Sequence, residues 1–160
     1  MRLEEEIKQT KFESEWHKLS VNIIFTYHWI KDHIHTFLKK HHITMQQFNV
    51  LRILRGQYPE PISTYLIRER LLDKMADVSR IVDRLEQQHL LTKKVSSDDK
   101  RFLDITITQK GLELLTVIDK DFPSLVHHYY ALSEEEAKQA NELLDKLRGT
   151  DPAEDAKQCS

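Results

Sequence analysis

Apolar residues recur at helical spacing through the first third of the chain. They fall three or four positions apart, at Phe12, Trp16, Leu19, Ile23, Tyr27, Ile30, Ile34 and Phe37. This period predicts one helix of roughly 25 to 30 residues. Ile24, Phe25 and Trp29 widen its apolar surface beyond one stripe, so one neighbour within a short chain would not cover it. We therefore expect part of this surface to contact a second subunit.

Capping residues divide the next stretch into shorter helices. Thr44 and Gln47 form a Thr-x-x-Gln capping box, and the apolar positions after it predict a helix that ends at Gly56. The segment YPEP at residues 58–61 interrupts the pattern. Residues 62–72 then predict a short helix, and residues 73–90 predict a stronger one that is capped by Asp73 or a neighbour.

Alternating apolar residues replace the helical pattern between residues 90 and 108. LLTKKV and FLDITIT predict two strands around the charged turn SSDDKR, with Leu103, Ile105 and Ile107 on one face. Helical spacing then resumes, with a kink expected at Pro123 and a last helix that is capped by Ser133. The expected fold class is mainly α with a small β-hairpin, in the order of four helices, the hairpin and two more helices.

The predicted helix at residues 74–89 has one apolar and one polar face. Val78, Ile81, Val82 and Leu85 lie within about 100° of arc. The opposite arc holds Ala76, Ser79, Arg80, Asp83, Arg84 and Gln87. Small, hydrogen-bonding and basic side chains suit a helix that lies against base edges in a DNA major groove. The solvent-exposed side of any amphipathic helix could look the same, so this helix alone does not decide the function.

The order of the elements favours DNA binding. A short helix, a helix with a basic outer face and a hairpin with a charged tip follow one another as in a winged helix-turn-helix. In that fold the hairpin, or wing, lies near the DNA backbone or minor groove, whose negative potential would attract Lys100 and Arg101. Asp99 would repel phosphate. Our hypothesis is that Asp99 pairs with Arg80 or Arg84 and braces the wing, and the alternative is that it only stabilises the turn.

Composition excludes several classes of protein. The 160 residues carry a net charge of −2, so nucleic-acid binding would depend on local placement of cations. The only cysteine, Cys159, excludes a disulfide framework and fits a cytoplasmic location. No segment has the apolar length that a membrane span requires. No nucleotide-binding glycine loop, Ser-His-Asp set or Glu-x-x-His pair indicates an enzyme, and no cofactor is expected.

The segment VSRIVDRLEQQHLLTKKVSSDDKRFLDITITQKGLELL resembles the signature of the MarR (multiple antibiotic resistance regulator) family. That signature has a Val-Thr-Arg-Leu-Val-Asp-Arg-Leu-Glu helix, a Gly-Leu-Val turn, an Asp-x-Arg wing and a Leu-Thr-x-x-Gly end. ITMQQFNVLRIL resembles the preceding helix of the family, and the likeness spans about Ile43 to Leu115. It implies an N-terminal dimerisation helix (1–43), a DNA-binding lobe (44–111), C-terminal dimerisation helices (112–148) and a disordered tail (149–160).

The resemblance also implies a function. Such a protein would bind a pseudo-palindromic operator in double-stranded DNA as a homodimer, as a repressor that a small aromatic effector releases. Residues 74–87 would enter the major groove. The expected DNA-binding residues are Lys74, Ala76, Asp77, Ser79, Arg80, Arg84, Lys93, Lys94, Lys100 and Arg101. Three positions depart from the family pattern. His89 replaces the glycine that normally ends the recognition helix, so the left-handed cap is lost or replaced by a costlier non-glycine one. Asp77 replaces a Ser or Thr, and Arg68 replaces a small residue in the preceding helix.

Other interpretations stay open at this point. Trp16, Tyr27, Trp29 and Phe48 could line an effector pocket, but they fit equally well as core or dimer contacts. Nine histidines allow a zinc-responsive regulator of the same fold, although adjacent histidines on a helix chelate poorly and we assign no metal ligand. A winged-helix protein-interaction module without DNA binding is a further alternative. Arg80, Lys100 and Arg101 on one surface argue against that module.

Overall fold

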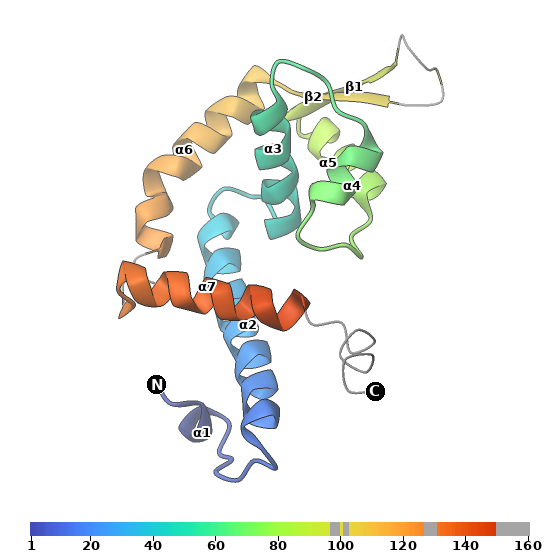
Figure 1. The fold of residues 1–160 in the computed structure, drawn as a ribbon. Helices are drawn as coiled ribbons and strands as arrows, with labels where there is room; N and C mark the ends of the chain where they lie inside the picture. Colours follow the sequence, from blue (N-terminus) through green and yellow to red (C-terminus); the bar gives the residue numbers. More distant parts are fainter. Residues whose placement is uncertain (97–99, 101–102, 127–130, 150–160) are drawn as a thin grey trace, which may run out of the picture. The chain divides into compact units, whose positions relative to one another are not determined.

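The computed structural model describes residues 1–96, 100, 103–126 and 131–149. Its elements are α1 (Leu3–Glu6), α2 (Glu15–Lys39), α3 (Met45–Gln57), α4 (Thr64–Arg70), α5 (Val78–Gln87), β1 (Leu91–Val95), β2 (Leu103–Ile107), α6 (Gln109–Val126) and α7 (Glu134–Gly149) (Figure 1). The chain divides into two compact units, residues 1–121 and 122–160. The sequence suggested boundaries after residues 43, 111 and 148, and that functional division stays a prediction. Of the predicted tail, residues 150–160 lie outside the described residues.

The two helices predicted from apolar spacing and capping are confirmed. α2 contains 25 residues, and the Ser14 hydroxyl accepts a hydrogen bond from the backbone N–H of His17 at its start. α3 begins with the predicted capping box. The Gln47 N–H donates to the Thr44 hydroxyl at 3.2 Å, and the Thr44 N–H donates to the Gln47 side-chain oxygen at 2.8 Å. This reciprocal pair satisfies two N–H groups that a helix start leaves open.

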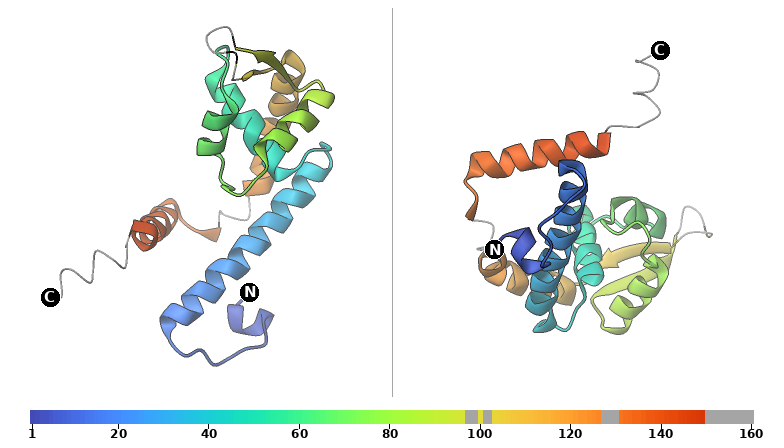
Figure 2. Two further views of the ribbon diagram at one scale, coloured as in Figure 1. Left: turned by 90° about the vertical axis from the view of Figure 1, so that its right-hand side faces the viewer. Right: turned by 90° about the horizontal axis from the view of Figure 1, so that it is seen from below.

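The core of the first unit lies between α3, α4, α5 and the hairpin. β1 and β2 pair antiparallel, and Ile62 adds a short bridge to Ile105 on the open side of β2. Figure 2 shows α2 extending away from this lobe. Leucine, isoleucine and valine dominate the buried cluster, which includes Val50, Leu51, Leu54, Ile67, Val78, Val82, Leu85, Leu91, Ile105 and Leu115. Of the predicted strand face, Ile105 and Ile107 are buried and Leu103 is exposed.

The start of α5 corrects the sequence prediction. Residues 74–76 were expected to be helical, but the helix begins only at Val78, with Asp77 as its N-cap. Two aspartates explain the difference. The Asp73 carboxylate accepts a hydrogen bond from the Met75 N–H at 3.0 Å, and the Asp77 carboxylate accepts one from the Arg80 N–H at 3.1 Å. Aspartate side chains compete with helical hydrogen bonding in this way, so they favour turns and caps.

The end of α5 keeps a left-handed cap without a glycine. His89 has a φ of 61°. Its N–H donates to the Glu86 carbonyl at 2.8 Å, and the Leu90 N–H donates to the Leu85 carbonyl at 3.0 Å. These two bonds are the Schellman pattern, and the buried side chains of Leu85 and Leu90 accompany it. Of the two outcomes expected without the glycine, loss of the left-handed cap or a non-glycine cap, the second is present.

We expect His89→Gly to stabilise the protein. A non-glycine residue in the left-handed region costs about 1 to 2 kcal/mol, and glycine gives back about 0.4 to 1 kcal/mol because it loosens the unfolded chain. The net gain in unfolding free energy should be about 0.5 to 1 kcal/mol. Urea unfolding would measure it. Gln87→Gly, two residues earlier inside the helix, is the control and should destabilise by about 1 kcal/mol.

The first turn of α6 is joined to this cap. The Gln88 carbonyl accepts from the Lys110 ammonium at 2.8 Å, the His89 carbonyl from the Thr108 hydroxyl at 2.8 Å, and the Leu90 carbonyl from the Thr108 N–H at 3.1 Å. Gly111 sits directly against this joint. The carbonyls of the three residues that follow α5 are thus satisfied by the segment that begins the next helix.

The remaining helices follow the predicted order. α6 runs through Pro123 and continues to Val126. In the second unit, α7 is capped by Ser133 as predicted, because the Ser133 hydroxyl accepts from the Glu136 N–H and the Ser133 N–H donates to the Glu136 carboxylate. The predicted end of this helix near Arg148 is also confirmed.

Candidate nucleic-acid interface

The polar face predicted for the basic helix is present on α5. Its apolar residues, Val78, Ile81, Val82 and Leu85, are buried. The side chains on the opposite side are exposed, at Ser79, Arg80, Asp83, Arg84 and Gln87. Leu85 and its neighbours hold the helix against the lobe, so its basic face is directed to solvent. This orientation is what a helix needs to enter a DNA groove.

Arg80 and Arg84 border a hollow in the surface. It has a volume of about 270 Å³ and lies between the start of α3 and the start of α5. Its lining residues are Thr44, Gln46, Gln47, Asp73, Met75, Ala76, Asp77, Arg80, Ile81 and Arg84. Neither guanidinium group has an ion pair or side-chain hydrogen bond with any residue that the structure describes. Both keep the planar donor groups that bind phosphate or guanine in pairs of hydrogen bonds.

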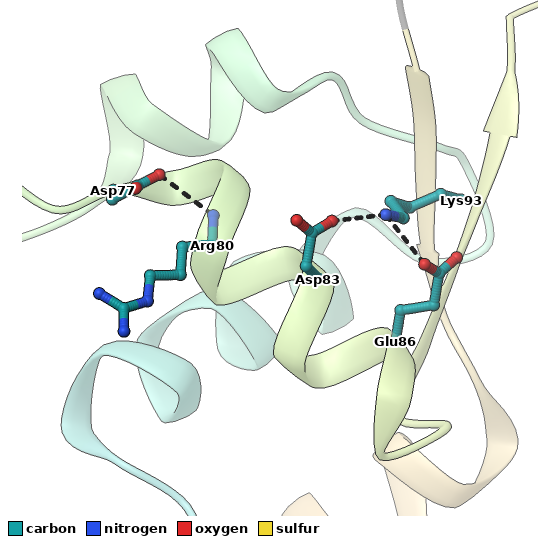
Figure 3. Close-up of polar contacts among 5 residues, drawn as sticks. All are labelled: Asp77, Arg80, Asp83, Glu86 and Lys93. Atoms are coloured by element: carbon teal, nitrogen blue, oxygen red, sulfur yellow. Dashed lines mark hydrogen bonds and ion pairs between the residues drawn. The ribbon is translucent and has the colours of Figure 1, made fainter.

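Lys93 is held between two carboxylates on the other flank of α5 (Figure 3). Its ammonium lies 2.6 Å from Asp83 Oδ1 and 2.9 Å from Glu86 Oε2. The hydrogen bonds that the ammonium donates, chiefly to Asp83 and then to Glu86, raise the pKa of Lys93 above its usual value, so the ammonium stays charged at neutral pH. The side chain of Arg80 points away from this group, as Figure 3 shows. The two flanks of α5 therefore differ: on one, the guanidinium groups have no partner among the described residues, and the other carries an ion-pair cluster.

The remaining predicted DNA-binding residues are dispersed. Lys74 donates to the Glu69 carbonyl at the end of α4, and Ala76 packs partly against the core. Lys94 is exposed on β1, opposite Asp104 in the strand register, and Lys100 is exposed. Asp77 is exposed, but its carboxylate caps α5. Arg101 and the bracing residue Asp99 lie outside the described residues, so the hypothesis of an Asp99–arginine pair stays untested.

Sequence reasoning missed three side chains beside the arginines. Thr44 and Gln46, at the start of α3, line the same hollow, and Met75 is 93% exposed directly before α5. The capping box marked the start of α3 but not its nearness to α5, which depends on tertiary packing. Nothing in the sequence pattern distinguished Met75 from a core methionine.

The four residues proposed for an effector pocket do not lie together. Tyr27 lines a pocket of about 420 Å³ between α2, the start of α3 and the turn before α5. Trp29 lines a smaller hollow beside α1, of about 130 Å³. Trp16 is 80% exposed, and Phe48 packs against the core. Of these four residues, only Tyr27 lines the larger pocket, and an effector-pocket role for any of them stays a prediction beside the alternative of core or dimer contacts.

Neither a metal site nor a membrane span is present among the described residues. In that part of the chain, no three His, Cys, Asp or Glu side chains lie close enough to hold a metal ion. None of its helices combines the length and the apolar character needed to cross a membrane.

Comparison with known proteins supplies the family. The MarR family model matches residues 43–102. The HTH-type transcriptional regulator MhqR of Bacillus subtilis (strain 168) is 31% identical over 131 residues, which are 81% of this chain and 89% of MhqR. The chain belongs to the MarR family. MarR-family proteins are DNA-binding transcriptional regulators rather than enzymes, and this chain shares that general activity.

Solved structures of other regulators share the fold of this MarR-family chain. A mutant MarR from E. coli complexed with operator DNA has a TM-score of 0.75 at 20% identity, over 86% of this chain and 99% of that chain. The organohalide-sensing regulator RdhR in its 2,4-dichlorophenol-bound form has a TM-score of 0.76 at 23% identity, over 88% of this chain and 85% of that chain. The predicted fold class, a mainly helical winged helix-turn-helix, is confirmed.

Proposed function

We propose that this MarR-family regulator is a homodimeric, ligand-responsive repressor of transcription. The observation that carries the proposal is the exposed face of α5, where Arg80 and Arg84 border a hollow and neither guanidinium group is engaged by the described residues. Two guanidinium groups on one exposed helical face suit recognition of bases and phosphates. The E. coli neighbour with the same fold is complexed with operator DNA.

The geometry supports a division of roles among the side chains. Ser79 and Arg80, in the first turn of α5, would contact base edges, since the first residues of a recognition helix reach deepest into the groove. Arg84, Lys94, Lys100 and the wing-tip Arg101 would contact phosphate or the minor groove. Lys93 is left out of the phosphate contacts, because two carboxylates already bind its ammonium.

Exposed apolar side chains support a homodimer. On α2, Trp16, Leu19, Ile24 and Tyr27 are exposed, and on α7 the same holds for Leu143, Leu144 and Leu147. Apolar surfaces of this kind on a small chain are usually covered by a partner. A two-fold dimer would place two copies of α5 about 34 to 36 Å apart, one turn of DNA, and so bind a pseudo-palindrome.

The pocket beside Tyr27 supports a response to ligand. It shares Thr44, Gln46 and Asp73 with the hollow beside Arg80 and Arg84. Within that shared wall, the Gln46 amide donates to the Asp73 carboxylate at 3.0 Å, and the other oxygen of Asp73 holds the turn before α5. A ligand that bonds to either side chain would compete with this contact and move the start of α5. RdhR, which has the same fold, is solved with an aromatic ligand.

Selection of bound sites from random duplex DNA would test the proposal. We expect the purified protein to enrich a pseudo-palindrome whose half-sites are one DNA turn apart. Small aromatic acids would then be screened for release of that duplex, and Zn²⁺ would be included because a metal-responsive regulator is the alternative. Failure to bind any duplex more tightly at low salt than at high salt would refute the function and favour a protein-interaction module.

We expect Lys94→Ala to weaken binding of all DNA sequences alike. Lys94 is exposed on β1 and is proposed to contact phosphate. Without it, each subunit would release one counterion fewer when the protein binds DNA. The slope of log K against log salt should fall by about 1 per subunit. Titrations of the selected duplex and of a scrambled duplex at several salt concentrations would measure this. A change confined to the selected duplex would contradict the phosphate assignment.

A further inference from the structure

Lys93 occupies an unusual place on the wing. Side chains alternate along a strand, so Lys93 lies on the same side of β1 as the buried Leu91. Its partner in the register is Ile105, which is fully buried. Lys93 is thus on the core-facing side of the hairpin, while its neighbour Lys94 is on the outer side. A lysine on the inner side must find acceptors, because an unpaired buried charge is costly.

Among the described residues, the acceptors come from α5. Asp83 and Glu86 are three residues apart, so they lie one turn apart on the same flank of the helix. The Lys93 ammonium lies 2.6 Å from one carboxylate and 2.9 Å from the other. The lysine side chain is only 21% exposed, whereas those of Asp83 and Glu86 are 58% and 41% exposed. The cation is therefore fixed in place, and one strand of the wing is tied to two turns of the helix.

We propose that Lys93 is a positioning residue, which clamps the wing to α5 through Asp83 and Glu86 so that both elements meet DNA in one fixed relative orientation. The inference rests on the proposed DNA-binding function. The sequence suggested that Asp99 braces the wing against α5. Here the same role belongs to Lys93 and the charges are reversed, because the cation comes from the wing and the carboxylates come from the helix.

The clamp also alters the charge that DNA meets. The two arginines of α5 are matched by two carboxylates, so the helix alone has no net charge. Lys93 pairs with both carboxylates, which lessens their repulsion of phosphate and leaves Arg80 and Arg84 as the dominant charges. The positioning role and this screening role need the same three side chains.

Removing the carboxylates distinguishes a clamp from a phosphate contact. If Lys93 served mainly to bind phosphate, Asp83→Asn with Glu86→Gln would free its ammonium and remove two repulsive charges, and DNA binding would strengthen. If Lys93 is a clamp, the same double variant loosens the wing and weakens binding. The two interpretations therefore predict opposite changes in DNA affinity for this one double variant, which removes only negative charge.

The binding experiment compares four proteins with the wild type on the selected duplex. We expect Lys93→Gln and the Asp83→Asn/Glu86→Gln variant each to weaken binding by about threefold to tenfold, as exposed ion-pair networks allow. The triple variant, which combines these three substitutions, should bind no more weakly than either of them, because all of them remove the same interaction. Lys93→Arg, which keeps the charge and hydrogen bonds, should bind within about twofold of the wild type. Tighter binding by the carboxylate variant, or additive losses in the triple variant, would overturn the proposal.

Two further readouts separate the clamp from phosphate contact and from DNA binding itself. The salt slope should be unchanged in Lys93→Gln, whereas the matched Lys94→Gln should lower it. In the protein without DNA, hydrogen exchange of the β1 and β2 amides should accelerate by about threefold or more in Lys93→Gln and not in Lys94→Gln. Unchanged exchange would refute the clamp even if DNA binding is confirmed, and accelerated exchange in a chain that binds no DNA would refute only the proposed function.

Discussion

Gly111→Ala is expected to lower the unfolding free energy by about 3 kcal/mol or more, as severe overpacking does. A Cβ atom at this position would lie 2.3 Å from the Leu90 carbonyl oxygen and 2.7 Å from Ile107 Cγ1. The carbonyl belongs to the backbone and already accepts the Thr108 N–H, so it cannot move aside without breaking that bond. The substitution forces α6 away from the hairpin.

Chemical denaturation followed by circular dichroism would measure the loss. Gly56→Ala is the matched control, because Gly56 is a helical glycine whose added Cβ would have no atom within 4 Å. That variant should gain about 0.5 to 1 kcal/mol, the helix propensity of alanine over glycine. Equal effects of the two substitutions would contradict a steric role for Gly111.

Arg80→Ala is expected to cost about 1 to 3 kcal/mol of binding free energy on the selected operator and to relax its sequence preference. Arg80 lies in the first exposed turn of α5, and among the described residues its backbone N–H is bound by the Asp77 cap while its guanidinium group has no partner. A guanidinium that binds a base through two hydrogen bonds discriminates against the wrong base by that amount. Non-specific affinity should fall much less.

The measurement is a pair of titrations, one on the selected duplex and one on duplexes altered at single positions. Arg80→Lys should fail to restore discrimination, because an ammonium cannot reproduce the paired donors. Lys94→Ala is the control, since it should weaken every duplex alike. Equal losses across all sequences for Arg80→Ala would show that this residue contacts phosphate instead of bases.

Local signals in the sequence predicted most of the fold. The capping box at Thr44 and the Ser133 cap each depend on residues within one helical turn, so their positions could be assigned without tertiary structure. The amphipathic period of α5 and the alternation in β2 were equally local. At His89 the sequence left two outcomes open, a lost cap or a non-glycine cap, and the positive φ shows that the second is present.

Contacts between distant segments were beyond the sequence. The pairing of Lys93 with Asp83 and Glu86 depends on which side of the hairpin packs on α5, and alternation alone gives two equivalent sides. The start of α5 was misplaced because the helical period extends through residues 74–76, where two aspartate caps override it. The sequence likewise did not show which aromatic residues share a location. Trp16, Trp29 and Phe48 share a residue type with Tyr27 but not a location.

The joint between α5 and α6 limits how this protein can move. Three successive carbonyls, those of Gln88, His89 and Leu90, are held by Thr108 and Lys110. Sliding one helix end past the other would break all three bonds together, so α5 and the first turn of α6 are expected to move as one rigid body. A small rotation of α6 about this joint would rotate α5 with it, and so change the angle of α5 in the proposed DNA groove. If α5 contacts DNA as proposed, a regulatory change in α6 would reach the DNA as a rotation of α5.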